Sequence, residues 1–210
     1  MIKILIADDH SIVREGLKQI VAESPEMAVR GEAVNGQQVL DLVYKTDYDL
    51  ILLDIAMPGR GGIDTLKQLK IEKPEIPVLI LSMYPEDQYA LRAIKAGASG
   101  YLTKESAPEE LIGAIIKVAR GGKYVSTDLV EKLVENLGKD TEKPDHTMLS
   151  DREYQVMTMI ANGKTVKEVG DELSLSVKTI STNRTRALKK MGMKNNAEFT
   201  YYAIKQGLVA

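Results

Sequence analysis

The first 120 residues alternate between two patterns of hydrophobic positions. Short apolar runs rich in Ile, Val and Leu predict buried strands, and the segments between them carry apolar residues at helical spacing. The predicted strands span residues 2–7, 28–33, 50–54, 78–82 and 100–103, and the predicted helices span residues 12–22, 37–44, 63–71, 88–96 and 111–120. Strict alternation of this kind is typical of a parallel sheet covered on both faces, so we expect a doubly wound α/β domain.

The chain changes character after residue 122. The following residues are mostly polar and charged; residues 125–137 are compatible with one amphipathic helix, and residues 138–145 resemble a hydrated linker. Beyond them the apolar spacing predicts four short helices and no strand, over residues 151–162, 166–173, 177–191 and 197–206. We therefore predict a first domain over residues 1–122, a partly helical linker over 123–146, and an all-α helix-turn-helix domain over 147–210.

Composition narrows the function classes. The 210-residue chain has no cysteine, which excludes disulfides, cysteine-ligated metals and thiol nucleophiles. No apolar run approaches the ~18 residues of a membrane helix, and no signal-peptide pattern opens the chain, so we expect a cytoplasmic protein without a membrane partner. The net charge of −2 divides unevenly, because residues 1–145 carry 18 basic and 24 acidic side chains whereas residues 146–210 carry 10 and 6. A basic C-terminal part is typical of proteins that bind nucleic acid.

Reactive side chains follow the ends of the predicted strands. Asp8 and Asp9 follow the first strand, Asp54 ends the third, Ser82 ends the fourth, and Lys104 follows the fifth. Because the carboxyl ends of parallel strands line one crevice, we expect these side chains to meet. Clustered carboxylates repel one another, and a divalent cation that prefers oxygen ligands, such as Mg²⁺, would keep them ionised. Asp54 would then be suited to accept a phosphoryl group.

These residues carry a family resemblance. In order and spacing, Asp8-Asp9, Leu52-Leu53-Asp54-Ile55-Ala56-Met57-Pro58, Ser82 and Lys104 resemble the receiver domain of bacterial two-component response regulators. The resemblance implies a flavodoxin-like five-stranded sheet in the order 2-1-3-4-5 and a phosphoryl group that Asp54 takes from a sensor histidine kinase. It also implies a Mg²⁺ ion held by the side chains of Asp8, Asp9 and Asp54 and by the backbone carbonyl of Ala56.

The resemblance further implies a conformational switch. In receivers the hydroxyl matching Ser82 moves toward the phosphoryl group, Lys104 supplies a cation, and the aromatic residue matching Tyr101 turns inward. One position departs from the family pattern, since receivers often have proline after this lysine and the chain has Glu105. The chain's two histidines, His10 and His146, are 136 positions apart and are given no catalytic or metal-binding role.

The C-terminal residues resemble a second family. The matching segments lie between residues 149 and 208 and resemble the LuxR-type helix-turn-helix domain, among them Leu149-Ser150-Asp151-Arg152-Glu153, Leu173-Ser174-Leu175-Ser176 and Lys178-Thr179-Ile180. The two domains together resemble a NarL/FixJ-type response regulator. This resemblance implies regulation of transcription through double-stranded promoter DNA, bound by a homodimer.

The predicted helix over residues 177–191 has two faces. Its apolar face, expected to pack on the other helices, comprises Val177, Ile180, Ala187, Leu188 and Met191. The resemblance places base-edge contacts on the opposite side, at Ser181, Thr182, Asn183 and Thr185. We assign Lys178, Thr179, Arg186 and Lys189 mainly to phosphate or flanking contacts. Arg184 falls on the apolar side, where its stem is expected to pack while its head reaches outward.

Other functions stay open on the sequence. A phosphotransfer enzyme or phosphatase could use Asp54 on small molecules, but dehalogenase-like enzymes need a second acid where Ala56 stands. A nicotinamide enzyme is disfavoured because no Gly-x-Gly-x-x-Gly follows the first strand. A receiver that never accepts phosphate and binds DNA constitutively is a third possibility. We expect no enzymatic activity beyond phosphorylation and dephosphorylation of Asp54 itself.

Overall fold

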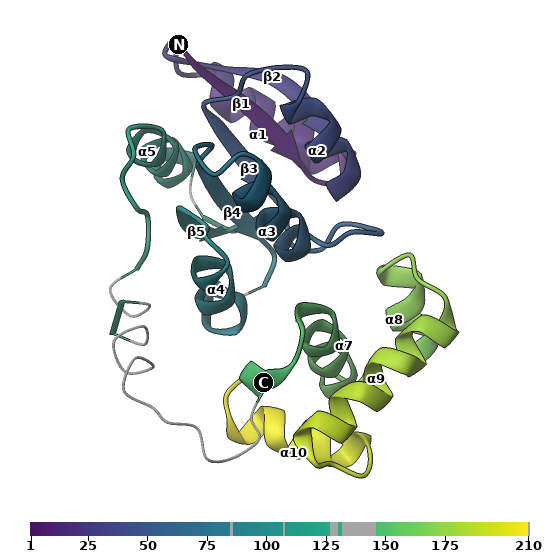
Figure 1. Cartoon of the computed structure of the whole chain (residues 1–210). Helices are drawn as coiled ribbons and strands as arrows, with labels where there is room; N and C mark the ends of the chain where they lie inside the picture. The colour runs from purple at the N-terminus through teal and green to yellow at the C-terminus, as the bar shows by residue number, and fades with distance from the viewer. Residues whose placement is uncertain (85, 107, 127–129, 132–145, 210) are drawn as a thin grey trace. The chain divides into compact units, whose positions relative to one another are not determined.

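The computed structural model describes residues 1–84, 86–106, 108–126, 130–131 and 146–209. The chain divides into two compact units, Met1–Leu137 and Gly138–Ala210. The first unit holds the sheet and the second is helical (Figure 1). Across the described residues, no helix combines the length and the apolar character that crossing a membrane requires.

The first unit is built on a parallel sheet. Its strands are β1 (Ile2–Ala7), β2 (Met27–Ala33), β3 (Leu50–Leu53), β4 (Val78–Ser82) and β5 (Gly100–Thr103). They pair in the order β2-β1-β3-β4-β5, so the α/β class and the strand order are both confirmed. The central strands β3 and β4 are buried along their whole length, which explains why they appear in the sequence as continuous apolar runs.

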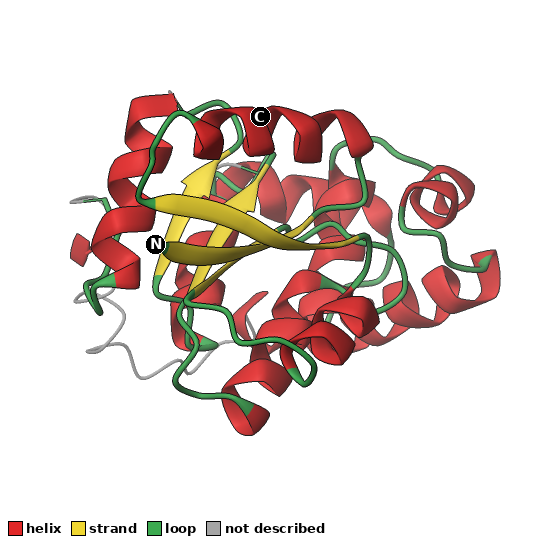
Figure 2. Ribbon diagram, turned by 90° about the horizontal axis from the view of Figure 1, so that it is seen from above, coloured by secondary structure: helices red, strands yellow, loops and turns green. Residues whose placement is uncertain are grey.

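Helices cover both faces of this sheet (Figure 2). They are α1 (Ser11–Ala22), α2 (Gly36–Val43), α3 (Gly62–Glu72), α4 (Glu86–Lys95) and α5 (Pro108–Ala119). The helices α1 and α5 contact each other on one face, and α3 lies between α2 and α4 on the other. A core cluster fills the first of these faces, where strand residues such as Ile4, Leu52 and Leu79 meet Leu17 and Ile115.

The last helix of this unit begins three residues before its predicted apolar segment, residues 111–120. Ser106 and Glu109 form a capping-box pattern that predicts an earlier start, and α5 begins at Pro108. Proline suits the first position of a helix because that position has no intrahelical partner for an N–H group, and its fixed φ already matches a helix. The apolar pattern missed this first turn because its residues, Pro108, Glu109 and Glu110, are all exposed.

The start of the predicted linker belongs to the sheet edge. Tyr124 forms a parallel bridge with Gly100, its N–H donates to the carbonyl of Ser99 at 2.9 Å, and its carbonyl accepts from the N–H of Tyr101 at 3.2 Å. A side chain on Gly100 would lie 2.6 Å from the carbonyl oxygen of Tyr124, so only glycine allows this approach. Most of the amphipathic helix predicted over residues 125–137 lies outside the described residues.

The second unit is all α. It comprises the short 3₁₀ helix η1 (His146–Met148), α7 (Asp151–Ala161), α8 (Val166–Glu172), α9 (Val177–Met191) and α10 (Asn196–Lys205). Reciprocal capping boxes begin α7 and α8, and side-chain caps from Ser176 and Asn195 begin α9 and α10. The helix α7 packs against α9 and α10, and α8 packs against α9. The predicted helix-turn-helix class is therefore confirmed.

Candidate phosphoacceptor and DNA-binding sites

Carboxylates gather at the carboxyl ends of β1 and β3, as predicted. Asp8 and Asp54 are 1% and 2% exposed, and Asp9 lies beside them. Together with His10, these residues offer ligand atoms that all lie within 4.8 Å of one another. We call Asp8, Asp9, Asp54 and Lys104 the acidic pocket.

Lys104 is the cation of the acidic pocket. Its Nζ lies 2.6 Å from Asp8 Oδ2 and donates to Asp54 Oδ2 at 2.9 Å, and its side chain is almost fully buried. Burial by itself lowers the pKa of Lys104, but the negative charges of Asp54 and Asp8 outweigh burial and hold the pKa above its ordinary value. Lys104 is therefore positively charged in the acidic pocket.

Asp54 is held in an environment that disfavours its charge. Burial raises the pKa of its carboxyl group, and Lys104 and the backbone of Ala56 oppose that rise only in part. Of its two oxygens, Oδ2 accepts from Lys104, whereas Oδ1 is buried and finds no hydrogen-bond partner among the described residues. Buried carboxylate oxygens are rarely left unpaired, so this atom is directed at a ligand or at an incoming group.

The loop after Asp54 is held close to α3. The carbonyl of Asp54 lies so near Gly62, the first residue of α3, that a Cβ at position 62 would collide with it. The N–H of Gly62 also donates to the carbonyl of Ile55 at 2.9 Å. Glycine at the start of α3 therefore sets the path of the backbone through Ala56, whose carbonyl the resemblance assigns to the metal.

The residues of the predicted switch lie on β4 and β5, beside Asp54. Ser82 is fully buried, and its Oγ accepts from the N–H of Tyr84 at 3.2 Å. Tyr101 is only 2% exposed, and its hydroxyl donates to the carbonyl of Tyr84 at 2.7 Å. Burial raises the pKa of Tyr101 far above the usual range, so the hydroxyl stays protonated and acts as a donor. The structure thus shows the inward position of Tyr101.

In the second unit, the residues predicted to contact DNA lie along α9. Six of them are exposed, namely Lys178, Thr179, Thr182, Thr185, Arg186 and Lys189, and Ser181 and Asn183 are half-buried. Three of the polar side chains donate to carbonyls of their own helix. Thr182 donates to Lys178 and Thr185 to Ser181, both at 2.9 Å, and Asn183 donates to Thr179 at 3.0 Å. These groups are ordered on the helix before any partner is bound.

The opposite side of α9 packs as predicted, with one exception. Ile180, Ala187, Leu188 and Met191 are buried, but Val177 is 52% exposed and the prediction for it is wrong. Val177 is the first residue of α9, and helical phase alone does not reveal that its side chain stays exposed. Arg184 is half-buried and its Nε donates to Asn196 at the start of α10, so its stem packs at the rim of the core.

Comparisons with known proteins assign each unit to a family. Residues 4–116 match the response regulator receiver domain, and residues 147–203 match the family of bacterial regulatory proteins of the luxR type. Response regulator GacA of Pseudomonas aeruginosa is 34% identical over 210 residues, which cover 100% of this chain and 98% of GacA. The chain belongs to the response regulators of the NarL/FixJ type.

Solved structures of RcsB resemble this response regulator over nearly its full length. RcsB from Salmonella enterica serovar Typhimurium, bound to promoter P1flhDC in the presence of the phosphomimetic BeF3⁻, is 26% identical, covers 99% of each chain and has a TM-score of 0.67. A structure of two RcsB dimers bound to two parallel DNAs is 26% identical with a TM-score of 0.60, over 97% of this chain and 98% of that one. Both domains of the regulator thus have structural counterparts.

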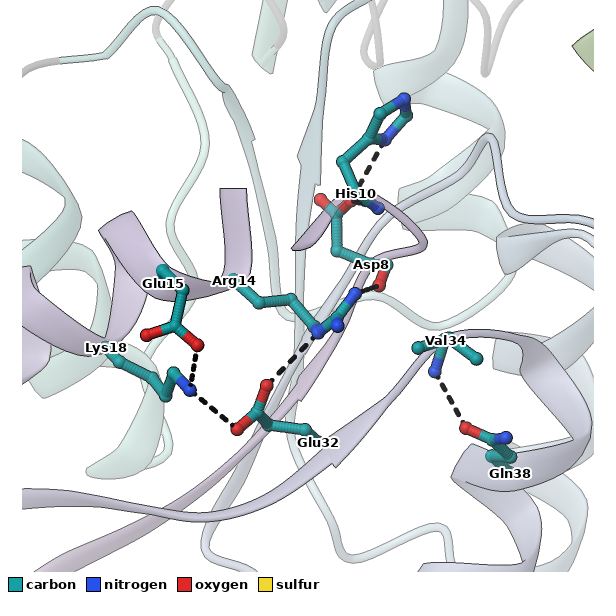
Figure 3. A network of polar contacts seen from close by, with 8 residues as sticks. All are labelled: Asp8, His10, Arg14, Glu15, Lys18, Glu32, Val34 and Gln38. Atoms are coloured by element: carbon teal, nitrogen blue, oxygen red, sulfur yellow. Dashed lines mark hydrogen bonds and ion pairs between the residues drawn. The ribbon is translucent and has the colours of Figure 1, made fainter. Parts of the chain in front are cut away.

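His10 lies beside the acidic pocket. The sequence analysis gave this residue no role. Its backbone N–H donates to Asp8 Oδ1 at 2.9 Å, and its ring Nδ1 lies 3.2 Å from that oxygen (Figure 3). The same Nδ1 lies 3.1 Å from Asp9 Oδ1. Arg14 of α1 donates to the carbonyl of Asp8 at 2.8 Å and so fixes the backbone of the same turn (Figure 3). The sequence contained a signal, because His10 directly follows two acidic residues at a strand end.

Proposed function

We propose that this response regulator accepts a phosphoryl group on Asp54 from a sensor histidine kinase, and that the modification controls sequence-specific binding to promoter DNA. The observation that carries the proposal is the state of the Asp54 carboxylate. One oxygen is paired with Lys104 at 2.9 Å, and the other is buried without a hydrogen-bond partner among the residues described. The match to the receiver family supports the role of phosphoacceptor for this oxygen.

A Mg²⁺ ion fits the acidic pocket. Asp8, Asp9 and Asp54 offer carboxylate oxygens close together, and Asp54 Oδ1 is buried with no partner within the described parts of the chain. The side chains of Asp8, Asp9 and Asp54 and the backbone carbonyl of Ala56 would hold the ion. When bound, it offsets the negative charge of the carboxylates and of the incoming phosphoryl group.

The chain's own residues then carry the transfer. The free oxygen of Asp54 forms a bond to phosphorus while the bond between phosphorus and the donor histidine nitrogen breaks. Lys104, already 2.9 Å from the other oxygen, stabilises the added charge, and the Ser82 hydroxyl donates to a phosphoryl oxygen. We propose no catalysis on other substrates, since the phosphoryl group enters and leaves only at Asp54.

The added charge would be read by the remainder of the molecule as a shift between two packings. A phosphorylated side chain carries about 1.5 to 2 negative charges and three acceptor oxygens. As Ser82 turns toward them, its bond from the N–H of Tyr84 at 3.2 Å is released, and Tyr101, bonded to the carbonyl of Tyr84, holds the inward position. This favours the active packing only as far as that packing binds the phosphoryl group better.

The helix α9 would enter the major groove. Ser181, Thr182, Asn183 and Thr185 would contact base edges, and the flanking contacts to phosphates would come from Lys178, Thr179, Arg186 and Lys189. RcsB dimers bind DNA in a solved structure, and a homodimer of this regulator would place two α9 helices on a two-fold site. We propose a cytoplasmic location, since the kinase contact and the DNA contact that we infer would both take place there.

Phosphorylation with a small donor tests the proposal. The full chain is incubated with acetyl phosphate and Mg²⁺, and its intact mass is compared with that of Asp54→Asn, which keeps the side-chain shape but removes the nucleophile. We expect a phosphoryl adduct on the wild type alone, abolished by EDTA. No adduct, or one that persists in Asp54→Asn, overturns the phosphoacceptor assignment and leaves a DNA-binding protein independent of phosphate.

A further inference from the structure

A second cavity of the receiver unit opens at the edge of the sheet opposite the acidic pocket. Its volume is about 340 Å³, which suits a small ligand. Residues that precede β4 and β5 line it, together with the ends of α3 and α5. Its lining includes Lys70, Glu75, Pro77, Ser99 and Lys123, and we call it the basal cavity. Because the strands are parallel, it lies at their amino ends and shares no residue with the phosphoacceptor site.

Two lysines reach the basal cavity from different elements. Lys70 stands in the last turn of α3, and its Nζ donates to the carbonyls of Pro74 at 3.2 Å and Ile76 at 2.5 Å. Lys123 follows α5, and its Nζ donates to the carbonyl of Ala98 at 3.1 Å. Ile76 and Ala98 each stand two residues before a strand, β4 and β5 respectively. Since neighbouring strands lie about 4.8 Å apart, the two ammonium groups are held near each other.

The charges of these two lysines are poorly balanced. Among the residues that the structure describes, neither lysine forms an ion pair with a carboxylate. Burial lowers the pKa of Lys70, the charge of Lys123 lowers it further, and Glu75 opposes this lowering without cancelling it. Two like charges held together repel each other, so an anion bound between them would relieve the repulsion.

A buried hydroxyl adds a further donor. Ser99 lines the same cavity and is only 7% exposed. Its N–H donates to Val78 at 2.7 Å and its carbonyl accepts from Tyr124 at 2.9 Å, whereas its hydroxyl has no bond within the described segments. Because an ammonium group has three N–H donors, Lys70 keeps one and Lys123 keeps two. Together with the hydroxyl, these donors and two positive charges match the oxygens and the charge of a phosphate group.

We propose that the basal cavity binds a small phosphorylated molecule, and that its phosphate group accepts hydrogen bonds from Lys70, Lys123 and Ser99. Pro77 and Val118 supply apolar wall for the rest of the ligand. The site is new relative to the phosphoacceptor function and does not rest on it, since the acidic pocket lies at the other edge of the sheet.

A nuclear magnetic resonance titration with glycerol 3-phosphate tests the site. The full chain is kept in EDTA at pH 7, so that no divalent cation recruits the probe to the acidic pocket, and backbone amide shifts are followed. We expect saturable shifts at Gly97, Ser99 and Gly122 and none at Asp8 or Asp54. The absence of saturable shifts at the basal cavity up to about 10 mM probe, well above a weak Kd of about 1 mM, overturns the proposal.

Two further probes test the class of ligand. Inorganic phosphate should bind at the same amides but more weakly, because it leaves the apolar wall uncovered. Malonate, which carries two carboxylates, should bind more weakly still, because its charges are not gathered on one group. Equal affinity for inorganic phosphate would replace the phosphorylated molecule by free phosphate, and equal affinity for malonate would overturn the preference for phosphate.

Variants of single charges complete the test. Lys70→Gln and Lys123→Gln should each weaken binding about tenfold, since each removes a charge-assisted hydrogen bond. The control Lys95→Gln removes an exposed lysine outside the lining and should change nothing. Glu75→Gln should tighten binding about two- to fivefold, which misfolding cannot mimic. Unchanged affinity in both cavity-lysine variants, or weaker binding in Glu75→Gln, overturns the proposal, and phosphorylation of Asp54 is unaffected in either case.

Discussion

At the scale of single residues, the acidic pocket lowers the stability of the fold. Its three carboxylates, Asp8, Asp9 and Asp54, lie close together. Two of them are almost fully buried, and Lys104 supplies the positive charge that the described structure places against them. Like charges in a small space repel one another at an effective dielectric well below that of water. The pocket is therefore destabilising until a cation or a phosphoryl group with its cation occupies it, as is common at functional sites.

Asp9→Asn should remove part of the destabilisation that the clustered carboxylates cause. The neutral amide relieves the repulsion from Asp8 and Asp54, so we expect the variant to be more stable than the wild type by about 1 kcal/mol in EDTA. Mg²⁺ should raise the free energy of unfolding of the wild type more than that of the variant, because it binds the folded wild type more tightly. Urea unfolding of both proteins with and without Mg²⁺ measures this. A variant less stable than the wild type in EDTA would contradict it.

Two substitutions on α9 should separate base reading from phosphate contact. Thr182→Ala should reduce the preference for the cognate sequence over random DNA, by about 1 to 3 kcal/mol, because we propose that this exposed residue contacts a base edge. Lys189→Ala should weaken binding to both duplexes and flatten the salt slope by about one unit. Fluorescence anisotropy over a salt series measures both. Equal losses on both duplexes for the two variants would rule out this division of roles.

The residues of the acidic pocket could be predicted because sequence order fixes which strand ends they follow, and parallel strands share one edge. His10 and Val177 could not be predicted in the same way. The position of a ring relative to two neighbouring carboxylates depends on the turn between β1 and α1, which a residue pattern does not specify. Val177 stands at the start of α9, and helical phase gives the face on which a side chain lies but not how much of it the neighbouring residues cover.

At the scale of elements, we expect alanine to destabilise the protein at Gly100 and to stabilise it at Gly113. A Cβ on Gly100 would lie 2.6 Å from the Tyr124 carbonyl, so Gly100→Ala should separate Tyr124 from β5 and cost about 1 to 3 kcal/mol. A Cβ on Gly113, within α5, meets nothing within 4 Å, so Gly113→Ala should stabilise the helix by about 0.5 to 1 kcal/mol. Thermal unfolding of both variants measures the signs, and a stabilised Gly100→Ala would show that Tyr124 does not pack as described.

The start of α7 should make the helical unit sensitive to acid. The buried Glu153 accepts Lys190 Nζ at 2.6 Å and the N–H of Ser150 at 2.8 Å. Burial by itself raises the pKa of Glu153, but Lys190 and Ser150 outweigh burial and leave the pKa below its ordinary value. Because the unfolded state then binds the proton more readily, the stabilisation is complete above the unfolded pKa of about 4.3 and is lost as pH falls below it.

Glu153→Gln tests this pH dependence. We expect it to cost about 1 to 3 kcal/mol near pH 7, where a hydrogen-bonded charge is replaced by a neutral amide, and progressively less as the pH is lowered from about 4.3. Urea unfolding of both proteins across this range gives the difference at each pH. A difference that stays constant down to acid pH would mean that the Glu153 carboxyl has no depressed pKa.

Most elements could be predicted because the buried strands and the helix faces repeat at distinct periods. The pairing of Tyr124 with β5 could not, because it involves one residue in a polar segment, and its backbone bonds to Ser99 and Tyr101 leave no trace in side-chain character. The first turn of α5 is exposed and carries no apolar period, so only the capping-box pattern of Ser106 and Glu109 indicated where this helix begins.

At the scale of the whole molecule, the net charge differs in sign between the N-terminal and C-terminal parts of the chain. The part up to residue 145 carries 18 basic and 24 acidic side chains, and the part from residue 146 carries 10 and 6, so the net charges are −6 and +4. A basic unit favours DNA, and an acidic unit on the same chain limits nonspecific attraction. Phosphorylation adds negative charge to the acidic unit, so any gain in DNA affinity must come from altered packing or pairing rather than from charge attraction.

DNA affinity before and after phosphorylation is the most direct test of this coupling. The probe is a labelled duplex selected from a random pool by the phosphorylated protein, and the readout is its Kd by anisotropy at fixed salt, with intact mass reporting the phosphorylated fraction. Binding by the wild type should tighten about fivefold or more, a typical coupling between distant sites, and binding by Asp54→Asn should not change. An unchanged Kd for a wild type shown by mass to be phosphorylated would contradict control of DNA binding by Asp54.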